Sequence, residues 1–263
     1  MNLAMNKVLS LLFLIVSGAV ILRQISLVKR GGPLPTIRKI AALEAISEVV
    51  GRATEMGRPV HFTSGVGKID DEFAPQTMAA TEILSNLARL CAEYGAKLLV
   101  SVCPTLVFPV QQDAVRHGYA LAGKIDEYSE DQVRFLSDQQ MAYASAAVAI
   151  IQREKAAANI MIGAFYGEFL LIAEAGLQSG AIQIGGTARM YQLPFAAVIF
   201  DYLLIGEEMF AGGAYITKDR AKLGAIQGQD YVKVGIICAT LVGAVFALMG
   251  SKALVNLLVK YGN

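Results

Sequence analysis

Two long apolar segments lie near the opposite ends of the chain and limit what it can fold into. Residues 8–22 (VLSLLFLIVSGAVIL) and residues 234–249 (VGIICATLVGAVFALM) contain no acidic or basic residue. An α-helix of about 20 mostly apolar residues crosses the hydrocarbon core of a bilayer. We therefore expect an N-terminal transmembrane anchor over residues 1–30, a second transmembrane helix over residues 229–260, and the lipid bilayer as a partner.

A cleaved signal peptide is the alternative for the first segment. Signal peptides end in a small-residue site of the A-x-A kind after the apolar run. Here the run continues past Ser17, Gly18 and Ala19 into Val20 and Ile21. Retention as an anchor is therefore favoured.

Basic residues near the two segments predict the orientation, because Lys and Arg accumulate on the cytoplasmic side of a membrane. We expect a protein of the cytoplasmic (inner) membrane with two spans, its central region in the cytoplasm and both termini outside. On the central side of the first segment lie Arg23, Lys29, Arg30, Arg38 and Lys39, and on its terminal side lies Lys7. On the central side of the second segment lie Lys218, Arg220, Lys222 and Lys233, and on its terminal side lie Lys252 and Lys260.

Small residues recur at every fourth position of the second segment: Gly235, Ala239, Gly243, Ala247 and Ser251. Such a ladder lets helix backbones approach closely in a membrane. It predicts packing either against the first segment or against another protomer. The alternative is that small residues are simply common in membrane helices.

Composition narrows the classes of protein. Hydrophobic residues make up 55% of the chain and charged residues 17%, which is unusual for a soluble protein. The net charge of +1, without a separate basic block, gives no sign of nucleic-acid binding. Cys91, Cys103 and Cys238 lack the spacing of a disulfide framework or a zinc site, so we expect a reducing compartment and no metal site.

The central region alternates between apolar strand-like runs and amphipathic helical segments. Continuous apolar strands separated by helices indicate a mainly parallel, Rossmann-like sheet with helices on both faces. We expect this α/β domain over residues 36–228, with Thr36 capping its first helix. The predicted strands are PVHFTSGVG, AKLLVSVCP, NIMIGAFYGE, GAIQIGG and Ala196–Ile205, and the predicted helices include Pro75–Tyr94, Val110–Ala122, Asp131–Lys155 and Glu207–Tyr215.

Residues 195–216 are apolar enough to cross a bilayer but contain Asp201 and the pair Glu207 and Glu208. A membrane helix would need a partner for each carboxylate. A buried strand leading into a helix needs fewer, because the helix dipole favours acids in the first turn. For Asp201 we expect Arg189, Lys68 or a neighbouring protomer as the partner.

Ligands of open parallel sheets bind beyond the carboxyl ends of the strands. SGVGK resembles a phosphate-binding loop but is an incomplete fingerprint, so a plain turn is favoured. The acids there are general-acid or metal-ligand candidates, although helix-terminal acids are ordinary. No catalytic residue or cofactor can be assigned. The candidate crevice comprises Ser64, Gly65, Gly67, Lys68, Glu168, Gly185, Gly186, Thr187, Glu207 and Glu208.

Two further residue types have chemical potential. Cys103 at a strand end and His117 on the following helix would form a thiolate pair if they faced each other. A simply buried cysteine is the favoured alternative. His61 lies within a strand, and we expect a hydrogen-bonded core or interface histidine rather than a base.

Charges are scarce in one part of the chain. Residues 156–216 contain six charged residues in 61 positions. A domain surface in water needs more polar groups than that, so burial against other protomers or other membrane-complex subunits is expected. A sheet deeply covered by its own helices is the alternative.

Long motifs give the chain a family resemblance. They cover most of Pro59–Lys233 and resemble a prokaryotic family of membrane-anchored proteins that share a domain of unknown function. The resemblance implies an α/β domain next to transmembrane helices, and no activity, cofactor or catalytic residue. The motifs are RPVHFTSGVG, DQVRFLSDQQMAYA, REKAAANIMIGAFYGEFLLIAEAG, AIQIGGTARMYQLPF, FDYLLIGEEMFAGGAYI and GQDYVK.

Two classes of function follow. The first is a non-catalytic structural or scaffolding subunit of an oligomeric membrane-associated assembly. It would self-associate through the charge-poor half of its α/β domain and through its transmembrane helices. The second is a membrane-tethered enzyme or ligand-binding subunit that uses the strand-end crevice. The first is favoured, because no complete catalytic constellation can be written.

Overall fold

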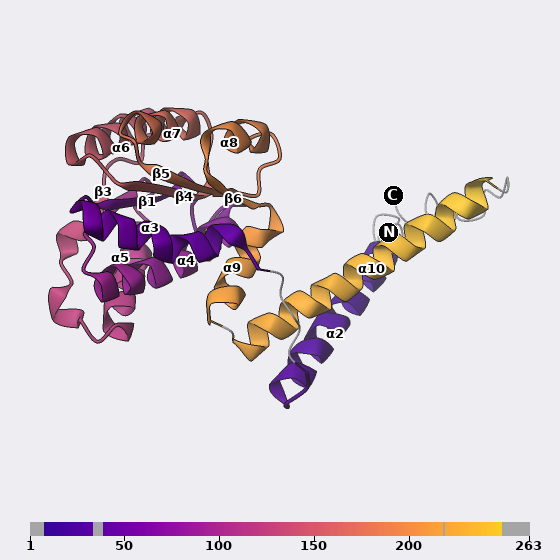
Figure 1. Cartoon of the computed structure of the whole chain (residues 1–263). Coiled ribbons are helices and arrows are strands. Elements are labelled where there is room, and N and C mark those ends of the chain that lie inside the picture. Colours follow the sequence, from indigo (N-terminus) through magenta and orange to yellow (C-terminus); the bar gives the residue numbers. More distant parts are fainter. Residues whose placement is uncertain (1–7, 34–38, 218, 249–263) are drawn as a thin grey trace. The chain divides into compact units, whose positions relative to one another are not determined.

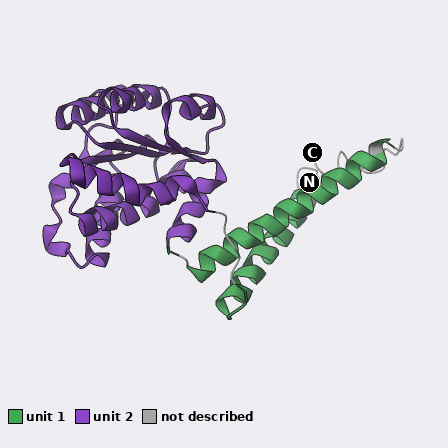
Figure 2. Cartoon of the chain, in the orientation of Figure 1, with its two compact units in different colours: residues 1–37, 217–263 green, residues 38–216 purple. Residues whose placement is uncertain are grey.

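The chain divides into two compact units, which we describe separately (Figure 2). The structure is a computed structural model that describes residues 8–33, 39–217 and 219–248. Residues 38–216 form one unit, called the α/β unit here. Residues 1–37 together with residues 217–263 form the other, called the helical unit.

The α/β unit is built on a six-stranded, entirely parallel sheet, which confirms the expected fold class. The strand order is β3-β2-β1-β4-β5-β6. The chain therefore moves outward in one direction from β1 to β3 and in the other from β4 to β6. The strands are β1 Val60–Gly65, β2 Leu98–Val102, β3 Val133–Phe135, β4 Ala158–Ala164, β5 Ile182–Thr187 and β6 Tyr202–Ile205.

Helices cover both faces of this sheet (Figure 1). One face carries α3 Ala41–Met56, α4 Ala74–Tyr94 and α5 Phe108–Leu121. The other face carries α6 Gln140–Glu154, α7 Glu168–Gln178 and α8 Leu193–Ile199. Two single-turn helices, Ile125–Glu127 and Glu130–Gln132, precede β3, and α9 Glu207–Thr217 follows β6.

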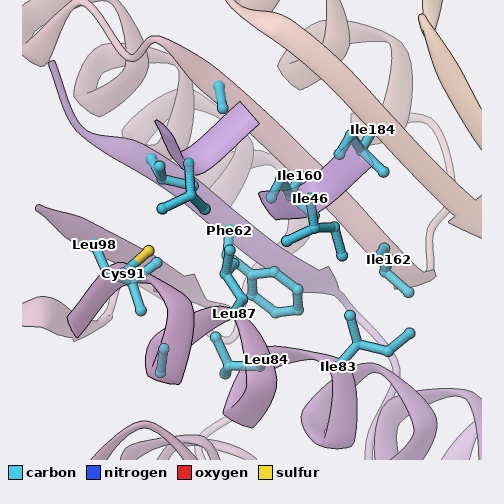
Figure 3. Packing of buried hydrophobic residues seen from close by; sticks show 14 of the residues in the cluster. Ile46, Phe62, Ile83, Leu84, Leu87, Cys91, Leu98, Ile160, Ile162 and Ile184 are labelled. Carbon is cyan, nitrogen blue, oxygen red and sulfur yellow. The ribbon is translucent and has the colours of Figure 1, made fainter. Parts of the chain in front are cut away.

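The apolar spacing of the sequence explains the core between the sheet and α3 and α4 (Figure 3). Alternate residues of the strands point to this face and meet the apolar stripes of the helices. Both helices end at a glycine with a left-handed backbone, Gly57 at φ 63° and Gly95 at φ 71°. The buried side chains include Phe62, Ile160, Ile162 and Ile184 of the sheet, Ile46 of α3, and Ile83, Leu84, Leu87 and Cys91 of α4.

The predicted helix Asp131–Lys155 is wrong in its first third. Residues Val133–Phe135 form β3, which pairs in parallel with β2 (Val100 opposite Val133), and α6 begins only at Gln140. The backbone amide of Leu136 continues this pairing by donating to the carbonyl of Val102 at 3.0 Å. Pairing with the sheet edge outweighs the local helical pattern.

The predicted strand Ala196–Ile205 is also partly wrong, because its first half forms α8. Pro194 occupies the first turn of α8, a position where its fixed φ suits a helix and its missing N–H is not needed. The strand is limited to Tyr202–Ile205. Asp201 therefore precedes the strand, and its carboxylate accepts the backbone amide of Gln183 at 2.8 Å; among the described residues it forms no ion pair with Arg189 or Lys68. Thr36, the predicted cap, lies outside the described residues.

A row of polar side chains crosses the other face of the sheet, beneath α7. His61, Asn159 and Gln183 are register neighbours on β1, β4 and β5, and all are buried. The Asn159 amide donates to Gln183 Oε1 at 2.8 Å, and the Gln183 amide donates to the carbonyl of Ala173 in α7 at 2.6 Å. Asn159 Oδ1 is therefore left as the acceptor for His61.

This arrangement fixes the hydrogen bonds of His61. Its Nδ1 donates to Asn159 Oδ1 at 2.8 Å, and its Nε2 accepts from the Ser101 hydroxyl at 2.9 Å. Burial lowers the pKa of His61 to about 4, against the opposing effect of the bond to Asn159, so the imidazole is neutral. His61 is a satisfied core histidine, as expected. We call Ser101, His61, Asn159 and Gln183 the polar row.

The helical unit contains α2 Val8–Lys29 and α10 Arg220–Leu248. By length and composition, both are long and apolar enough to cross a membrane, over Ser10–Lys29 and Arg220–Phe246. They pack closely where Gly224 and Gly228 face α2: an added Cβ would lie 2.9 Å from Ile25 Cα and 2.7 Å from Ile21 Cα.

The predicted small-residue ladder begins beyond this close contact. A Cβ added to Gly235 would meet nothing within 4 Å, and Ala239 is exposed. The close approach to α2 occurs at Gly224 and Gly228, which the ladder did not include, and Gly243 of the ladder is half-buried. Packing against another protomer stays a prediction. The side chain of Ala247 and all of Ser251 lie outside the described residues.

Candidate functional site

The carboxyl ends of the strands converge where β1 and β4 lie side by side, at the point where the strand order reverses. Such a switch point is where open parallel sheets bind ligands. Gly65 (φ 77°) ends β1 and Gly163 (φ 147°) lies near the end of β4. A side chain on either would clash with the backbone of the other strand. The two glycines thus allow the strand ends to touch.

Three backbone amides of the segment SGVGK, at the end of β1, are engaged within the fold. The amide of Gly65 donates to Thr63 Oγ1 at 3.2 Å, and that of Val66 donates to the carbonyl of Ala164 at 2.9 Å. The amide of Lys68 donates to Asp71 Oδ2 at 3.2 Å. A phosphate cradle needs several free amides. The plain-turn alternative fits this geometry better.

The side chains of this loop are also engaged. Ser64 is buried, and its hydroxyl accepts a hydrogen bond from the Gln111 amide at 2.6 Å. Gly67 packs against α4, where an added Cβ would lie 2.7 Å from Thr77 Oγ1. Lys68 alone of these predicted residues is exposed.

The two glycines of GGTA lie within β5, not in a turn, and are required by packing. An added Cβ would lie 2.8 Å from the ring of Phe200 at Gly185, and 3.1 Å from Leu204 Cβ at Gly186. Thr187 is buried, and its hydroxyl accepts the amide of Arg189 at 3.2 Å. Gly185, Gly186 and Thr187 are therefore engaged in the sheet, where they pair with Leu203, Leu204 and Ile205 of β6.

A stacked arginine ties the strand-end loops together. The guanidinium of Arg189 lies 4.1 Å from the ring centroid of Phe73 and 3.9 Å from that of Tyr166. It donates to the carbonyl of Phe165 at 3.1 Å and to the hydroxyl of Tyr191. Cation–π contacts of this kind contribute about 0.5–2 kcal/mol each. The Arg189 side chain thus connects the loops after β1, β4 and β5.

The predicted acids separate into two places. Glu168 is buried at the start of α7, where it accepts the Tyr166 amide at 2.9 Å and the side-chain amide of Gln140. Glu207 and Glu208 lie in the first turn of α9, and Glu208 accepts the Ile205 amide at 3.1 Å. Because β6 is the far edge strand, this pair is not at the switch point.

The predicted thiolate pair does not form. Cys103 is buried at the end of β2, whereas His117 is exposed on α5. Burial and the nearby carboxylates of Glu168 and Asp138 raise the pKa of Cys103 to about 12, although Lys68 opposes them. The thiol therefore stays protonated at neutral pH. Among the residues that the structure describes, no group of three or more His, Cys, Asp or Glu side chains is placed to hold a metal ion.

A cavity of about 240 Å³ remains at the strand ends. We call it the strand-end cavity. Of the candidate crevice residues only Lys68 lines it, together with Cys103, which the sequence had indicated for a thiolate pair. Asp138 and Gln140 were missed, although the segment SDQQ after β3 would have indicated these two had β3 been recognised. It is lined by Val66, Lys68, Asp71, Phe73, Cys103, Pro104, Asp138, Gln140 and Tyr166.

A second feature is an exposed apolar surface around α8, called the α8 surface. It consists of Met190, Tyr191, Phe195 and Val198, whose exposed fractions are 75%, 58%, 55% and 86%. Phe195 and Val198 are three residues apart and share one side of the helix. Single exposed apolar residues are ordinary, whereas contiguous apolar patches of several hundred Å² are typical of interaction sites.

Comparison with known proteins identifies the family. The family model described as a domain of unknown function (DUF6754) matches residues 2–258, so the chain belongs to that family. Neither the curated proteins nor the solved structures gave a match.

Proposed function

We propose that this member of the DUF6754 family is a non-catalytic structural subunit of a membrane-associated homo-oligomer. In this proposal α2 and α10 cross the cytoplasmic membrane, and the α/β unit lies in the cytoplasm. The subunits associate through the charge-poor half of the α/β unit and through the membrane helices. Other membrane-complex subunits are additional candidate partners.

The α8 surface is the observation that carries the proposal. Its four side chains are each more than half exposed, and they belong to the segment with six charged residues in 61 positions. Burying one such side chain completely contributes about 1.5–3 kcal/mol. Covering all four contributes at most about 6–12 kcal/mol, which is of the same order as the cost of association, about 4–15 kcal/mol, so in this proposal the membrane helices contribute as well.

The strand-end geometry gives less support to an enzyme. The amides of Gly65, Val66 and Lys68 are engaged within the fold, and the Cys103 thiol is protonated. The Glu168 carboxylate accepts two hydrogen bonds within the fold, one on each oxygen, which fix its orientation. These contacts are typical of a stable scaffold.

Mass measurement of the full chain in detergent tests the proposal. The wild-type chain is expected to be an oligomer, and the double variant Phe195→Asp/Val198→Asp is expected to dissociate to smaller species. The matched control is Met56→Asp/Leu121→Asp, which changes two exposed apolar residues at the ends of α3 and α5. A monomeric wild-type chain, or equal dissociation of the control, would refute the assignment.

Topology is tested separately by labelling. Ser129 is exposed in the α/β unit, so a Ser129→Cys variant in a Cys238→Ser background presents one accessible thiol. An impermeant thiol reagent should label it in inverted vesicles and leave it unlabelled in intact cells. Labelling of intact cells would reverse the proposed orientation.

A further inference from the structure

The strand-end cavity is not explained by a scaffolding role. Two larger hollows, of about 470 and 360 Å³, lie between outer helical segments. The strand-end cavity is smaller, at about 240 Å³, but it occupies the switch point of the sheet, where the loops after β1, β2 and β4 meet. Its size suits a ligand smaller than the drug-sized molecules that fill sites of 300–1,000 Å³.

Opposite charges from different loops line this cavity. Lys68 comes from the loop after β1, and Asp138 comes from the loop after β3. Asp138 is held in place by Thr105, whose amide donates to Oδ1 at 2.8 Å and whose hydroxyl donates to Oδ2. Within the described residues, the ammonium of Lys68 makes no ion pair.

The remaining walls are apolar or weakly polar. Phe73, Pro104 and Tyr166 supply ring and aliphatic surface. Cys103 is 2% exposed, and its thiol makes no hydrogen bond in the described part of the chain. Gln140 adds an amide whose nitrogen is tied to Glu168, which leaves its carbonyl oxygen as an acceptor.

Asp71 and Asp138 have their oxygens partly engaged, yet each carboxylate oxygen has a second lone pair that a ligand cation can use. Lys68 retains all three of its donors. A ligand with a carboxylate and an ammonium group satisfies both walls at once. Lys68 and Asp138 are both exposed, so a ligand with a single charge would pair with one of them and leave the other to water, and only a ligand with both charges uses both groups.

We propose that the strand-end cavity binds a small zwitterion, an α-amino acid with an apolar side chain. Lys68 binds its carboxylate, Asp138 binds its ammonium group, and the side chain lies against Phe73 and the Cys103 thiol. The site goes beyond the scaffolding role and does not depend on it. A phosphate ligand fits less well, because the loop amides are engaged and two Asp carboxylates line the cavity.

The test uses the full chain in detergent and L-leucine as the probe, measured by titration calorimetry and by saturation transfer to the leucine methyl groups. Two analogues each lack one charge: 3-methylbutylamine lacks the carboxylate, and 4-methylpentanoate lacks the ammonium group. We expect L-leucine to bind, and each analogue to bind about tenfold more weakly, the factor that corresponds to one lost charged hydrogen bond.

Variants assign the binding to the cavity. Lys68→Met and Asp138→Asn should each weaken L-leucine binding about tenfold. Lys97→Met is the matched control, because Lys97 is an exposed lysine before β2, at the opposite end of the sheet, paired with Glu154 at 3.1 Å. Its affinity for L-leucine should equal that of the wild type.

Three results would overturn the proposal. The first is the absence of heat and of saturation transfer with L-leucine in the wild-type chain, which needs no variant to interpret. The second is equal binding of 3-methylbutylamine, which would make the cavity a site for cations alone. The third is unchanged binding in both Lys68→Met and Asp138→Asn. None of these results bears on the oligomer mass, so the two proposals fail independently.

Discussion

Protonation of His61 should destabilise the α/β unit in mild acid. The imidazole is buried, donates to Asn159 and accepts from Ser101. A proton added to Nε2 would place a positive charge in the core. It would also turn Nε2, which accepts a hydrogen bond from the Ser101 hydroxyl, into a donor. The folded protein therefore resists protonation, whereas the unfolded chain does not.

The size of the effect follows from the two pKa values. The folded pKa of His61 is lowered from 6.5 to about 4. Because the folded pKa is depressed, the unfolded state binds the proton more readily as pH falls. Stability is therefore fully present above pH 6.5 and decreases between pH 6.5 and about 4. This pKa difference contributes about 3 kcal/mol to the free energy of unfolding at neutral pH, and most of that contribution is lost by about pH 4.5.

Urea unfolding of the full chain in detergent, followed by circular dichroism between pH 7.5 and 4.5, measures this dependence. His61→Gln cannot titrate, so its stability should change less over this range. At pH 7.5 it should be less stable than the wild type by about 1–3 kcal/mol, because the buried side chains of Asn159 and Ser101 lose their hydrogen bonds to the imidazole. The stability difference between the two proteins should shrink as pH falls.

His117→Gln is the control, since the chain has two histidines and this one is exposed. Its pH dependence should match that of the wild type. Carboxylates such as Glu154, whose pKa is lowered by Lys97, titrate in all three proteins and cancel in the comparison. Parallel pH profiles for wild type and His61→Gln would show that His61 does not carry the effect.

Three further predictions concern other parts of the chain. Gly228→Leu should separate α2 from α10 and lower the thermal stability of the helical unit by several degrees, as measured by thermal aggregation in detergent. Gly235→Leu should leave the α2–α10 contact intact, and it should lower the oligomer mass only if the ladder binds another protomer. Arg189→Met should remove two ring contacts and increase hydrogen exchange in the loops after β1 and β4. Glu207→Gln/Glu208→Gln should reduce stability by at most about 1 kcal/mol and leave the oligomer mass unchanged if the pair only caps α9, and a change in mass would contradict that role.

The sequence predicted the parallel sheet correctly because β2 (LLVSV) and β4 (ANIMIGA) are nearly continuous apolar runs and helical segments separate the strands. Periodicity failed where elements are short. β3 has three residues with Arg134 at its centre, too few to show a period of two. The apolar run after Pro194 has no alternation that separates a helix from a strand. Proline in the first turn was the available signal, and it indicated α8.

For the candidate site, the sequence predicted only the edge of the sheet, because parallel strands deliver their carboxyl ends to one edge. The switch point required the strand order, which the sequence analysis did not predict. Whether an amide or a thiol is free there depends on tertiary contacts, such as that of Val66 with Ala164, which no local pattern encodes. Asp138 was missed because recognising it required β3.

The polar row has a consequence for strand alignment. Central strands rich in Val, Ile and Leu fit one another in several offsets, since one aliphatic side chain packs much like the next. The hydrogen bonds from Ser101 through His61 and Asn159 to Gln183 all run in one direction, and they form only when β1, β4 and β5 are in the native offset. A slip of two residues would keep every apolar face inward but leave buried amides without acceptors. The row thus selects one alignment among several that the apolar core alone would accept.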